Sequence, residues 1–315
     1  MTYNNFMTYK KKWSAVMNDF LATRRQGIGG SDIAAIIGVS KFKTALEVYL
    51  SKTTDQPEQQ GEHLYWGHAL ENPIIDRFVQ DTGANVIRQP EMRRHPDYEW
   101  AIANADALIV DGAGNPQAIL EIKTSSAFKS REWGADDTDE VPIEYIAQVQ
   151  WYMWIYDVQE AYLAALIGGN QYRQYHIKRD DELIAMLAEK AQAFWQNHVI
   201  PRIPPEPQNG EDAQKLYPHD NGDTAQADSD TLTAYVELRE LKAQEKELKA
   251  QIAECEDLLK IKIGSYSAMQ ANGNTLFTWE AQQSQRFDSS AFKNAHPDLY
   301  RQYTKTSETR VLRLK

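Results

Sequence analysis

The chain has 315 residues, a net charge of −11, 42% hydrophobic and 25% charged residues, and one cysteine. This composition is typical of a soluble globular protein and excludes a chain that is disordered throughout. One cysteine excludes an internal disulfide and any cluster held by several cysteines, so a metal ion would be held by carboxylates, which favour magnesium or manganese. The acidic total excludes a surface coated for nucleic-acid binding, but it is compatible with a nuclease that has a local basic channel.

Membrane insertion and secretion are not expected. The longest apolar stretches, such as 161–169, are far shorter than the roughly 20 residues needed to span a bilayer. The first residues contain no apolar signal core followed by a small-residue cleavage site. We therefore predict a cytoplasmic protein.

The first part of the chain is predicted to be helical around a glycine-rich turn. A helix over 13–24 precedes the turn "GIGGSD" (27–32) and a second helix, which Ser31 or Asp32 would cap by accepting backbone N–H groups. A further helix is predicted over 44–53.

The next segments predict one amphipathic helix followed by a group of strands. The helix covers 64–83, carries Glu71 near an otherwise apolar face and ends at Gly83. Three strands follow, the last two joined by the hairpin turn "DGAGNP": 84–89, 99–110 and 118–126.

Helices and strands then alternate up to about residue 205. They comprise a helix over 141–156, strands over 160–169 and 172–179, and a helix over 181–199. Interleaved helices and a central hairpin indicate an α/β or α+β fold, with a central mixed sheet flanked by helices.

The chain beyond this first domain (1–205) is predicted to form a linker and an extension. Residues 206–230 carry seven acidic residues against one lysine, as expected for an acidic linker. In the extension, 231–315, a helix over 232–262 has apolar residues at steps of three and four, which permits a coiled-coil or helix-hairpin seam. A β-hairpin follows around 271–279. The extension could pack on the first domain or contact DNA or a partner.

A charged pair interrupts the apolar strand "AILEIKTSS". Glu121 and Lys123 are expected to project together from one face, opposite to a buried set: Ile119, Leu120 and Ile122. Taken alone, a Glu-x-Lys pair is most often a solvated strand face.

A carboxylate metal site gives this pair a chemical role. A hard cation needs several oxygen ligands, and the hairpin would bring Asp106 beside Glu121. Glu71 and the backbone carbonyl of Ile122 are further candidate ligands. Lys123 could orient or help deprotonate an attacking water and offset charge on a phosphorane-like transition state. The sequence therefore allows a Mg²⁺ site, with Mn²⁺ as a substitute.

Five segments occur in an order that is characteristic of one nuclease family. They are "RRQGIGGSDIAAIIG", "WGHALENPIIDRF", "NADALI", "LEIK" and "YIAQVQWYMW". Over about residues 20–205 the chain resembles the phage lambda exonuclease and YqaJ-type viral recombinase family, which has a PD-(D/E)xK core. The resemblance implies that Asp106 and Glu121 bind Mg²⁺, that Lys123 acts on the water, and that Glu71 serves the metal directly or through water.

The resemblance also implies residues around the metal. Gln148 would support catalysis, whereas Tyr152 is expected to pack. Arg24 and Ser31 would grip the 5′-phosphate of the digested strand, and Arg25 is a rival because a one-residue shift exchanges the two arginines. Without the family context, "GIGGSD" is more simply a helix cap.

One departure from the family pattern lies just before the catalytic aspartate. Ala105 occupies a position where proline is frequent, which affects the backbone rather than the chemistry. Asn104 is a further candidate for phosphate contact.

The activity implied is a Mg²⁺-dependent exonuclease that degrades one strand of linear double-stranded DNA from its 5′ end. The resulting 3′ overhang would pass to a single-strand annealing protein, and relatives imply a homotrimeric ring, encoded by a phage or prophage in a bacterial host. The alternatives are an endonuclease or Cas4-like nuclease on the same core, and a DNA-binding protein that has lost the chemistry.

Overall fold

The computed structural model describes residues 22–55 and 61–314. The helix predicted over 13–24 lies outside these residues except for its last turn, which is helical. The chain divides into two compact units, Met1–Leu216 and Tyr217–Lys315.

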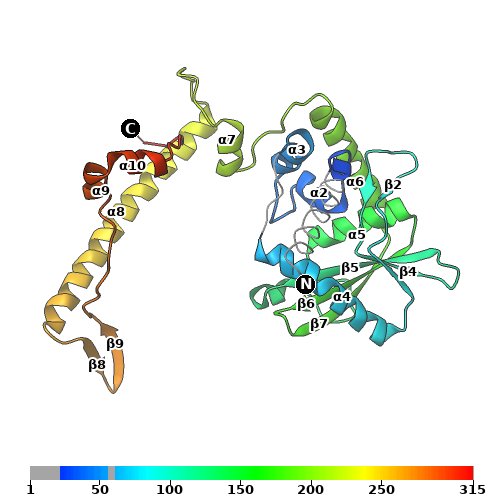
Figure 1. Ribbon diagram of the computed structural model, residues 1–315, viewed down its shortest axis with the longest axis horizontal. Helices are drawn as coiled ribbons and strands as arrows, with labels where there is room; N and C mark the ends of the chain where they lie inside the picture. The colour runs from blue at the N-terminus through cyan, green and yellow to red at the C-terminus, as the bar shows by residue number, and fades with distance from the viewer. Residues whose placement is uncertain (1–21, 56–60, 315) are drawn as a thin grey trace. The chain divides into compact units, whose positions relative to one another are not determined.

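A five-stranded mixed sheet forms the centre of the first unit, in the order β1-β4-β5-β6-β7 (Figure 1). Strands β5 and β6 run parallel because helix α5 (Ile143–Tyr156) connects them, whereas the other neighbouring pairs are antiparallel. The strands are β1 (Val86–Arg88), β4 (Ala107–Val110), β5 (Pro116–Ser125), β6 (Glu160–Ile167) and β7 (Gln171–Lys178). The predicted mixed sheet is confirmed.

Helices cover both faces of this sheet. On one face, α4 (Glu62–Thr82) packs Ile75 and Phe78 against Leu120 and Ile122 of β5. On the other face lie α5, α2 and α6, which enclose the larger core. Their bounds are α5 (Ile143–Tyr156), α2 (Gly30–Ile36) and α6 (Asp181–Phe194). The sheet is therefore covered on both sides, and most side chains of its middle strands are apolar.

The sequence prediction placed one residue of β5, Ile119, on the wrong face of the sheet. Ile119 is fully buried in the larger core, so it shares the α5 face with Glu121 and Lys123 rather than opposing them. Side chains alternate with a period of two, which places Leu120 and Ile122 on the α4 face. Glu121 is 2% exposed, so the charged pair lies inside the protein and does not form a solvated face.

The predicted cap of the helix after the glycine-rich turn was also only half right. Helix α2 has Gly29 at its cap position, and the Asp32 carboxylate accepts the Gly29 N–H (3.1 Å) from within the first turn. The Ser31 hydroxyl does not cap the helix, because it accepts a hydrogen bond from Arg24.

The strand predicted over 99–110 is divided in two. Strand β3 (Ile102–Ala103) pairs with β2 (Arg93–Arg94), whereas β4 pairs with β1 and β5 of the main sheet. The chain passes from one sheet to the other between these strands. Asp106 lies in that break, directly before β4.

Helix α3 (Ala45–Thr53) is capped by Thr44. The Thr44 hydroxyl accepts the Glu47 N–H, and the Glu47 carboxylate accepts the Thr44 N–H. The predicted C-terminal helix of this unit continues past α6 as a π-helical turn, η2 (Trp195–Val199). A short helix, α7 (Gly210–Leu216), falls inside the segment predicted as a linker. Its buried Asp212 accepts a hydrogen bond from Thr44 (2.9 Å).

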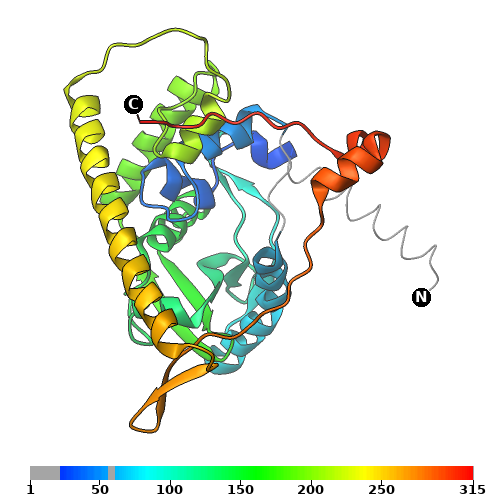
Figure 2. The ribbon, with the colours of Figure 1, turned by 90° about the vertical axis from the view of Figure 1, so that its left-hand side faces the viewer.

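The second unit is built on one long helix. Figure 2 shows α8 as an unbroken rod that leads into a β-hairpin. The elements are α8 (Ser229–Ile263), β8 (Ala268–Ala271), β9 (Asn274–Thr278), α9 (Ser289–Ala295) and α10 (Pro297–Tyr303). Among the helices of the described residues, none has the length and apolar character needed to cross a bilayer.

Candidate active site

The hairpin of β4 and β5 brings two acidic residues together. Ala107 pairs with Leu120 in the antiparallel register, which sets Asp106 beside Glu121. The Asp106 carboxylate extends the strand ladder, because its Oδ2 accepts the backbone N–H of Ile122 (2.8 Å). This hydrogen bond fixes Asp106 against the central strand although it lies outside β4.

Lys123, Glu121 and Gln148 form a closed triangle of hydrogen bonds. Lys123 Nζ donates to Glu121 Oε1 (2.7 Å) and to Gln148 Oε1 (3.0 Å), and Gln148 Nε2 donates to Glu121 Oε1 (2.6 Å). Helix α5 supplies Gln148 and also Tyr145, whose ring centre lies 4.9 Å from Lys123 Nζ. The polar groups of β5 and α5 therefore meet in the layer between sheet and helix.

Burial and mutual repulsion perturb the two carboxyls. Burial raises the pKa of Asp106 well above its ordinary value, and the neighbouring Glu121 charge raises it further. Burial likewise raises the pKa of Glu121, although Lys123 opposes this shift. Burial lowers the pKa of Lys123, but Glu121 and Asp106 outweigh it, and the net shift is upward. Two carboxylates with one ammonium leave an excess of negative charge in a buried site.

This donor set fits a hard cation. Within the described part of the chain, Glu121 Oε2 is buried and has no hydrogen-bond partner, so one carboxylate oxygen beside Asp106 stays available. Carboxylate oxygens are the ligands that Mg²⁺ and Mn²⁺ prefer. Across residues 22–55 and 61–314, however, no set of three or more His, Cys, Asp or Glu side chains is arranged to hold a metal ion.

The third predicted acid, Glu71, has another hydrogen-bond partner. Its carboxylate is bonded to His68 on the same helix (2.7 Å), and its side chain is 15% exposed. It is nonetheless near enough for its charge to contribute to the raised pKa values of Asp106 and Glu121. The backbone carbonyl of Ile122 remains a predicted ligand.

The two arginines predicted to bind phosphate have different hydrogen-bond partners. Arg24 donates to the Ser31 hydroxyl, whereas Arg25 is paired with the exposed Asp55 (2.7 Å). Asn104 is exposed in the break between β3 and β4. Of the two arginines, Arg24 is thus the one that the fold joins to Ser31.

Gly30 allows the glycine-rich turn to approach the carboxylate site. A Cβ at this position would lie 2.5 Å from Tyr152 Cε1 and 3.0 Å from Gln148 Cγ. The Tyr152 hydroxyl in turn accepts a hydrogen bond from Gln148 Nε2 (3.1 Å), so Tyr152 is bonded as well as packed. The turn that carries Ser31 and the helix that carries Gln148 are therefore in direct contact.

Substituting alanine for Gly30 should lower the free energy of unfolding by about 1–3 kcal/mol, because the added methyl group overpacks a buried contact. Gly67 is the matched control, since it is helical and a Cβ there would meet nothing within 4 Å. Gly67→Ala should stabilise the protein by roughly 0.5–1 kcal/mol. Urea denaturation measures both changes. Equal stabilisation by the two substitutions would contradict the tight contact at Gly30.

Sequence reasoning missed a second charged cluster, which adjoins Ser31. Asp32 is fully buried and forms ion pairs with Lys43 (2.9 Å) and Lys52 (2.7 Å). The sequence predicts a role for Asp32 only as a helix cap. Lys43 lies in the loop before α3, and Lys52 lies in the last turn of α3. No periodic pattern in the sequence links either lysine to Asp32.

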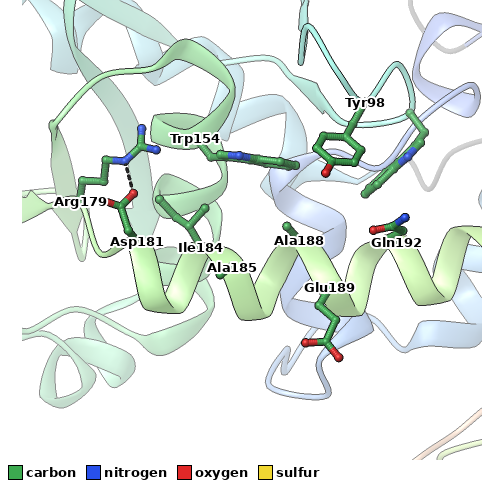
Figure 3. Close-up of a pocket in the computed structure, with 10 residues that line it drawn as sticks. Tyr98, Trp154, Arg179, Asp181, Ile184, Ala185, Ala188, Glu189 and Gln192 are labelled. Carbon is green, nitrogen blue, oxygen red and sulfur yellow. Dashed lines mark hydrogen bonds and ion pairs between the residues drawn. The ribbon is translucent and has the colours of Figure 1, made fainter.

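A cavity of about 460 Å³ lies elsewhere on the first unit (Figure 3). Tyr98 and Trp154 face Ile184 and Ala188 of α6 across it, and Trp100 also lines it. Its lining also contains the polar residues Arg179, Asp181, Glu189 and Gln192, and it includes none of the predicted site residues. It therefore does not coincide with the carboxylate site.

Comparison with known proteins identifies the family. Residues 19–159 match the model of the YqaJ-like viral recombinase domain. The chain is 34% identical over 315 residues to the Uncharacterized protein YqaJ of Bacillus subtilis (strain 168), covering 95% of this chain and 94% of that protein. The chain belongs to the YqaJ-like viral recombinase family. This confirms the resemblance recognised from the five sequence segments.

Solved structures similar to this YqaJ-like chain include two exonucleases. The alkaline exonuclease LHK-Exo of Laribacter hongkongensis, in complex with dAMP, is 21% identical with a TM-score of 0.48, over 63% of this chain and 97% of that chain. A phage-related exonuclease from Haemophilus somnus 129PT is 18% identical with a TM-score of 0.42, over 54% of this chain and 92% of that chain.

Proposed function

We propose that this YqaJ-like protein is a Mg²⁺-dependent exodeoxyribonuclease that digests one strand of linear double-stranded DNA from its 5′ end. The observation that carries the proposal is the partly buried group of Asp106, Glu121 and Lys123, in which a carboxylate pair lies beside an ammonium group. Metal-assisted phosphodiester hydrolysis needs a site that can hold a cation beside a group that positions the attacking water, and these residues would serve both purposes. The viral recombinase family is consistent with a DNA substrate.

Asp106 and Glu121 would hold the cation. A divalent ion bound there would polarise the scissile phosphate and lower the pKa of a bound water. The raised pKa values of both carboxyls support this assignment, because each carboxyl is destabilised as an anion until a cation neutralises it. Glu71 would help indirectly, through its charge or a bridging water.

Lys123 would act on the attacking water. Its raised pKa keeps it protonated, so it would orient the water by donating a hydrogen bond and offset charge that develops on the phosphate. Gln148 would hold Lys123 and Glu121 in this orientation, since it bonds to both. A side chain with hydrogen bonds on both its donor and acceptor atoms is well suited to positioning its neighbours.

Arg24 and Ser31 would bind the 5′-terminal phosphate. Arginine suits bidentate contact with phosphate oxygens, and a hydroxyl can donate to a third oxygen. The contact through Gly30 and Tyr152 links this region to Gln148, so a phosphate bound here would be held at a fixed place relative to the carboxylates. Arg25 and Asn104 would lie at the margin of the DNA-binding surface.

The proposed product is a duplex with a 3′ single-stranded overhang, for use by a single-strand annealing protein in phage-type recombination. Assembly as a homotrimer around DNA is part of the same proposal, and its support is the family resemblance. A C-terminal extension separated from the nuclease domain by an acidic linker remains a prediction.

End-labelled linear duplex DNA and closed circular DNA test the proposal side by side. With Mg²⁺, nucleotides should be released from the 5′-labelled strand of the linear duplex, and the closed circle should stay intact. Cutting of the circle would show an endonuclease. Failure to release nucleotides from a 5′-phosphorylated end with either Mg²⁺ or Mn²⁺ would leave only a DNA-binding role.

A further inference from the structure

The charged cluster beside Ser31 contains two lysines and only one carboxylate. Lys43 and Lys52 both pair with the single carboxylate of Asp32, so the three residues together carry one net positive charge. Lys52 Nζ also donates to the backbone carbonyl of Arg24 (3.0 Å). Helices α2 and α3, which carry Asp32 and Lys52, lie side by side in the first unit (Figure 1).

The charged groups of this cluster shift one another's pKa values. Burial alone would raise the pKa of Asp32, but Lys52, Lys43 and Arg24 outweigh it and hold the pKa well below its ordinary value. Burial lowers the pKa of Lys52, and the nearby Arg24 and Lys43 add to that shift. A second carboxylate, Glu47, is close enough to feel Lys43 but is itself paired with Lys215. The cluster is therefore an electropositive site.

The two lysines differ in what they can reach. The Lys52 side chain is 3% exposed and that of Asp32 is 1% exposed, so both are enclosed. The Lys43 side chain is 30% exposed and lies in the loop before α3, so its ammonium group can contact a ligand from solvent. Lys52 can act only through Asp32 and through the backbone of Arg24.

We propose that Lys43 is a phosphate-binding residue that makes this site select a terminal phosphate monoester over an internal phosphodiester, with Asp32 and Lys52 as positioning residues. The inference rests on the proposed function, because it extends the site of Arg24 and Ser31. A phosphate monoester carries between one and two negative charges near neutral pH, since its second pKa is about 6, whereas a diester carries one. The net positive charge on the cluster therefore favours the strand end.

Asp32 has a defined part in this arrangement. Its carboxylate holds Lys43 on one oxygen, and it accepts Lys52 and the Gly29 N–H on the other. One acid thus fixes the lysine, the glycine-rich turn and, through Lys52, the backbone of Arg24. These contacts set the spacing of the ligand-binding groups before a phosphate arrives, which lowers the ordering cost of binding.

The test is DNA binding in the presence of a chelator, so that hydrolysis does not interfere. Wild-type protein should bind linear duplex with 5′-phosphate ends at least about tenfold more tightly than the same duplex with 5′-hydroxyl ends, the size expected for one charge-assisted contact. Lys43→Gln should remove most of this preference by weakening only the phosphorylated duplex. Lys43→Arg should retain it. Inorganic phosphate should compete with the phosphorylated duplex in the wild type.

Lys41 provides the matched control, because it lies in the same loop, is 53% exposed and is paired with Glu132. Lys41→Gln should leave the preference for phosphorylated ends unchanged. An unchanged preference in Lys43→Gln, or equal weakening on both kinds of end, would overturn the proposal. Equal binding of phosphorylated and hydroxyl ends by the wild-type protein would also overturn it. This second comparison does not depend on whether a variant folds.

The outcomes separate this inference from the nuclease proposal. Protein that prefers phosphorylated ends but hydrolyses no DNA with Mg²⁺ would keep the phosphate site and refute the nuclease. Protein that digests both kinds of end and binds them equally would support the nuclease proposal and refute the selective phosphate site.

Discussion

Replacing Lys123 with alanine is expected to lower hydrolysis of linear duplex DNA by about 100- to 1,000-fold, the usual effect of removing one hydrogen-bond donor that stabilises charge in the transition state. Lys123 Nζ is bonded to both Glu121 and Gln148, so it is held in the position where an attacking water would be oriented. DNA affinity should stay close to that of the wild type, because the side chain is proposed to act on the water rather than to grip the strand. Nucleotide release and DNA binding are measured on the same preparations.

Lys178 is a suitable control for this substitution, because it is an exposed lysine on β7 of the same sheet. Lys178→Ala should hydrolyse DNA at the wild-type rate. Thermal denaturation of both variants would show whether each is folded. Wild-type turnover by folded Lys123→Ala would remove Lys123 from the mechanism.

Asp106→Asn is expected to abolish activity and yet to stabilise the protein in the absence of divalent ions. Asp106 lies partly buried beside Glu121, and an asparagine could still accept the Ile122 N–H while carrying no charge. At neutral pH without divalent ions, the variant should gain about 1–3 kcal/mol in free energy of unfolding, the scale of an uncompensated buried polar group. Adding Mn²⁺ at 100 times its dissociation constant should stabilise the wild type by about 2.7 kcal/mol and the variant much less.

The pH dependence of stability follows from the same shift. The folded protein raises the pKa of Asp106 well above its ordinary value, so ionisation of this carboxyl opposes folding. Its destabilising contribution is absent below the ordinary pKa and grows as the pH rises from that value to the raised pKa. Without divalent ions, wild-type protein should lose stability across this window relative to Asp106→Asn. Parallel stability curves for the two proteins would contradict the assignment.

The main elements could be predicted from local patterns in the sequence. Helices α4 and α5 follow from apolar residues at helical spacing, and the hairpin of β4 and β5 follows from its turn residues. The hairpin also predicted that Asp106 would meet Glu121. What failed was the face of Ile119, because the charged pair suggested one solvated face whereas helices cover both.

The phosphate region was harder to predict because its contacts join separate segments. Successive residues on a helix point about 100° apart, so only the folded structure shows that Arg24 meets Ser31 while Arg25 meets Asp55. The pairing of Asp32 with Lys43 and Lys52 depends on how α2 packs against α3. No local spacing encodes such a contact.

The position of β5 in the sheet has a consequence for how the site responds to heat and denaturant. β5 is the middle strand of five, paired on both edges and covered on both faces. Backbone amides of such a strand exchange with solvent only when the whole domain opens, so they are the slowest to exchange. The carboxylates and Lys123 therefore keep their mutual geometry through local fluctuations at the loops, and loss of that geometry accompanies global unfolding.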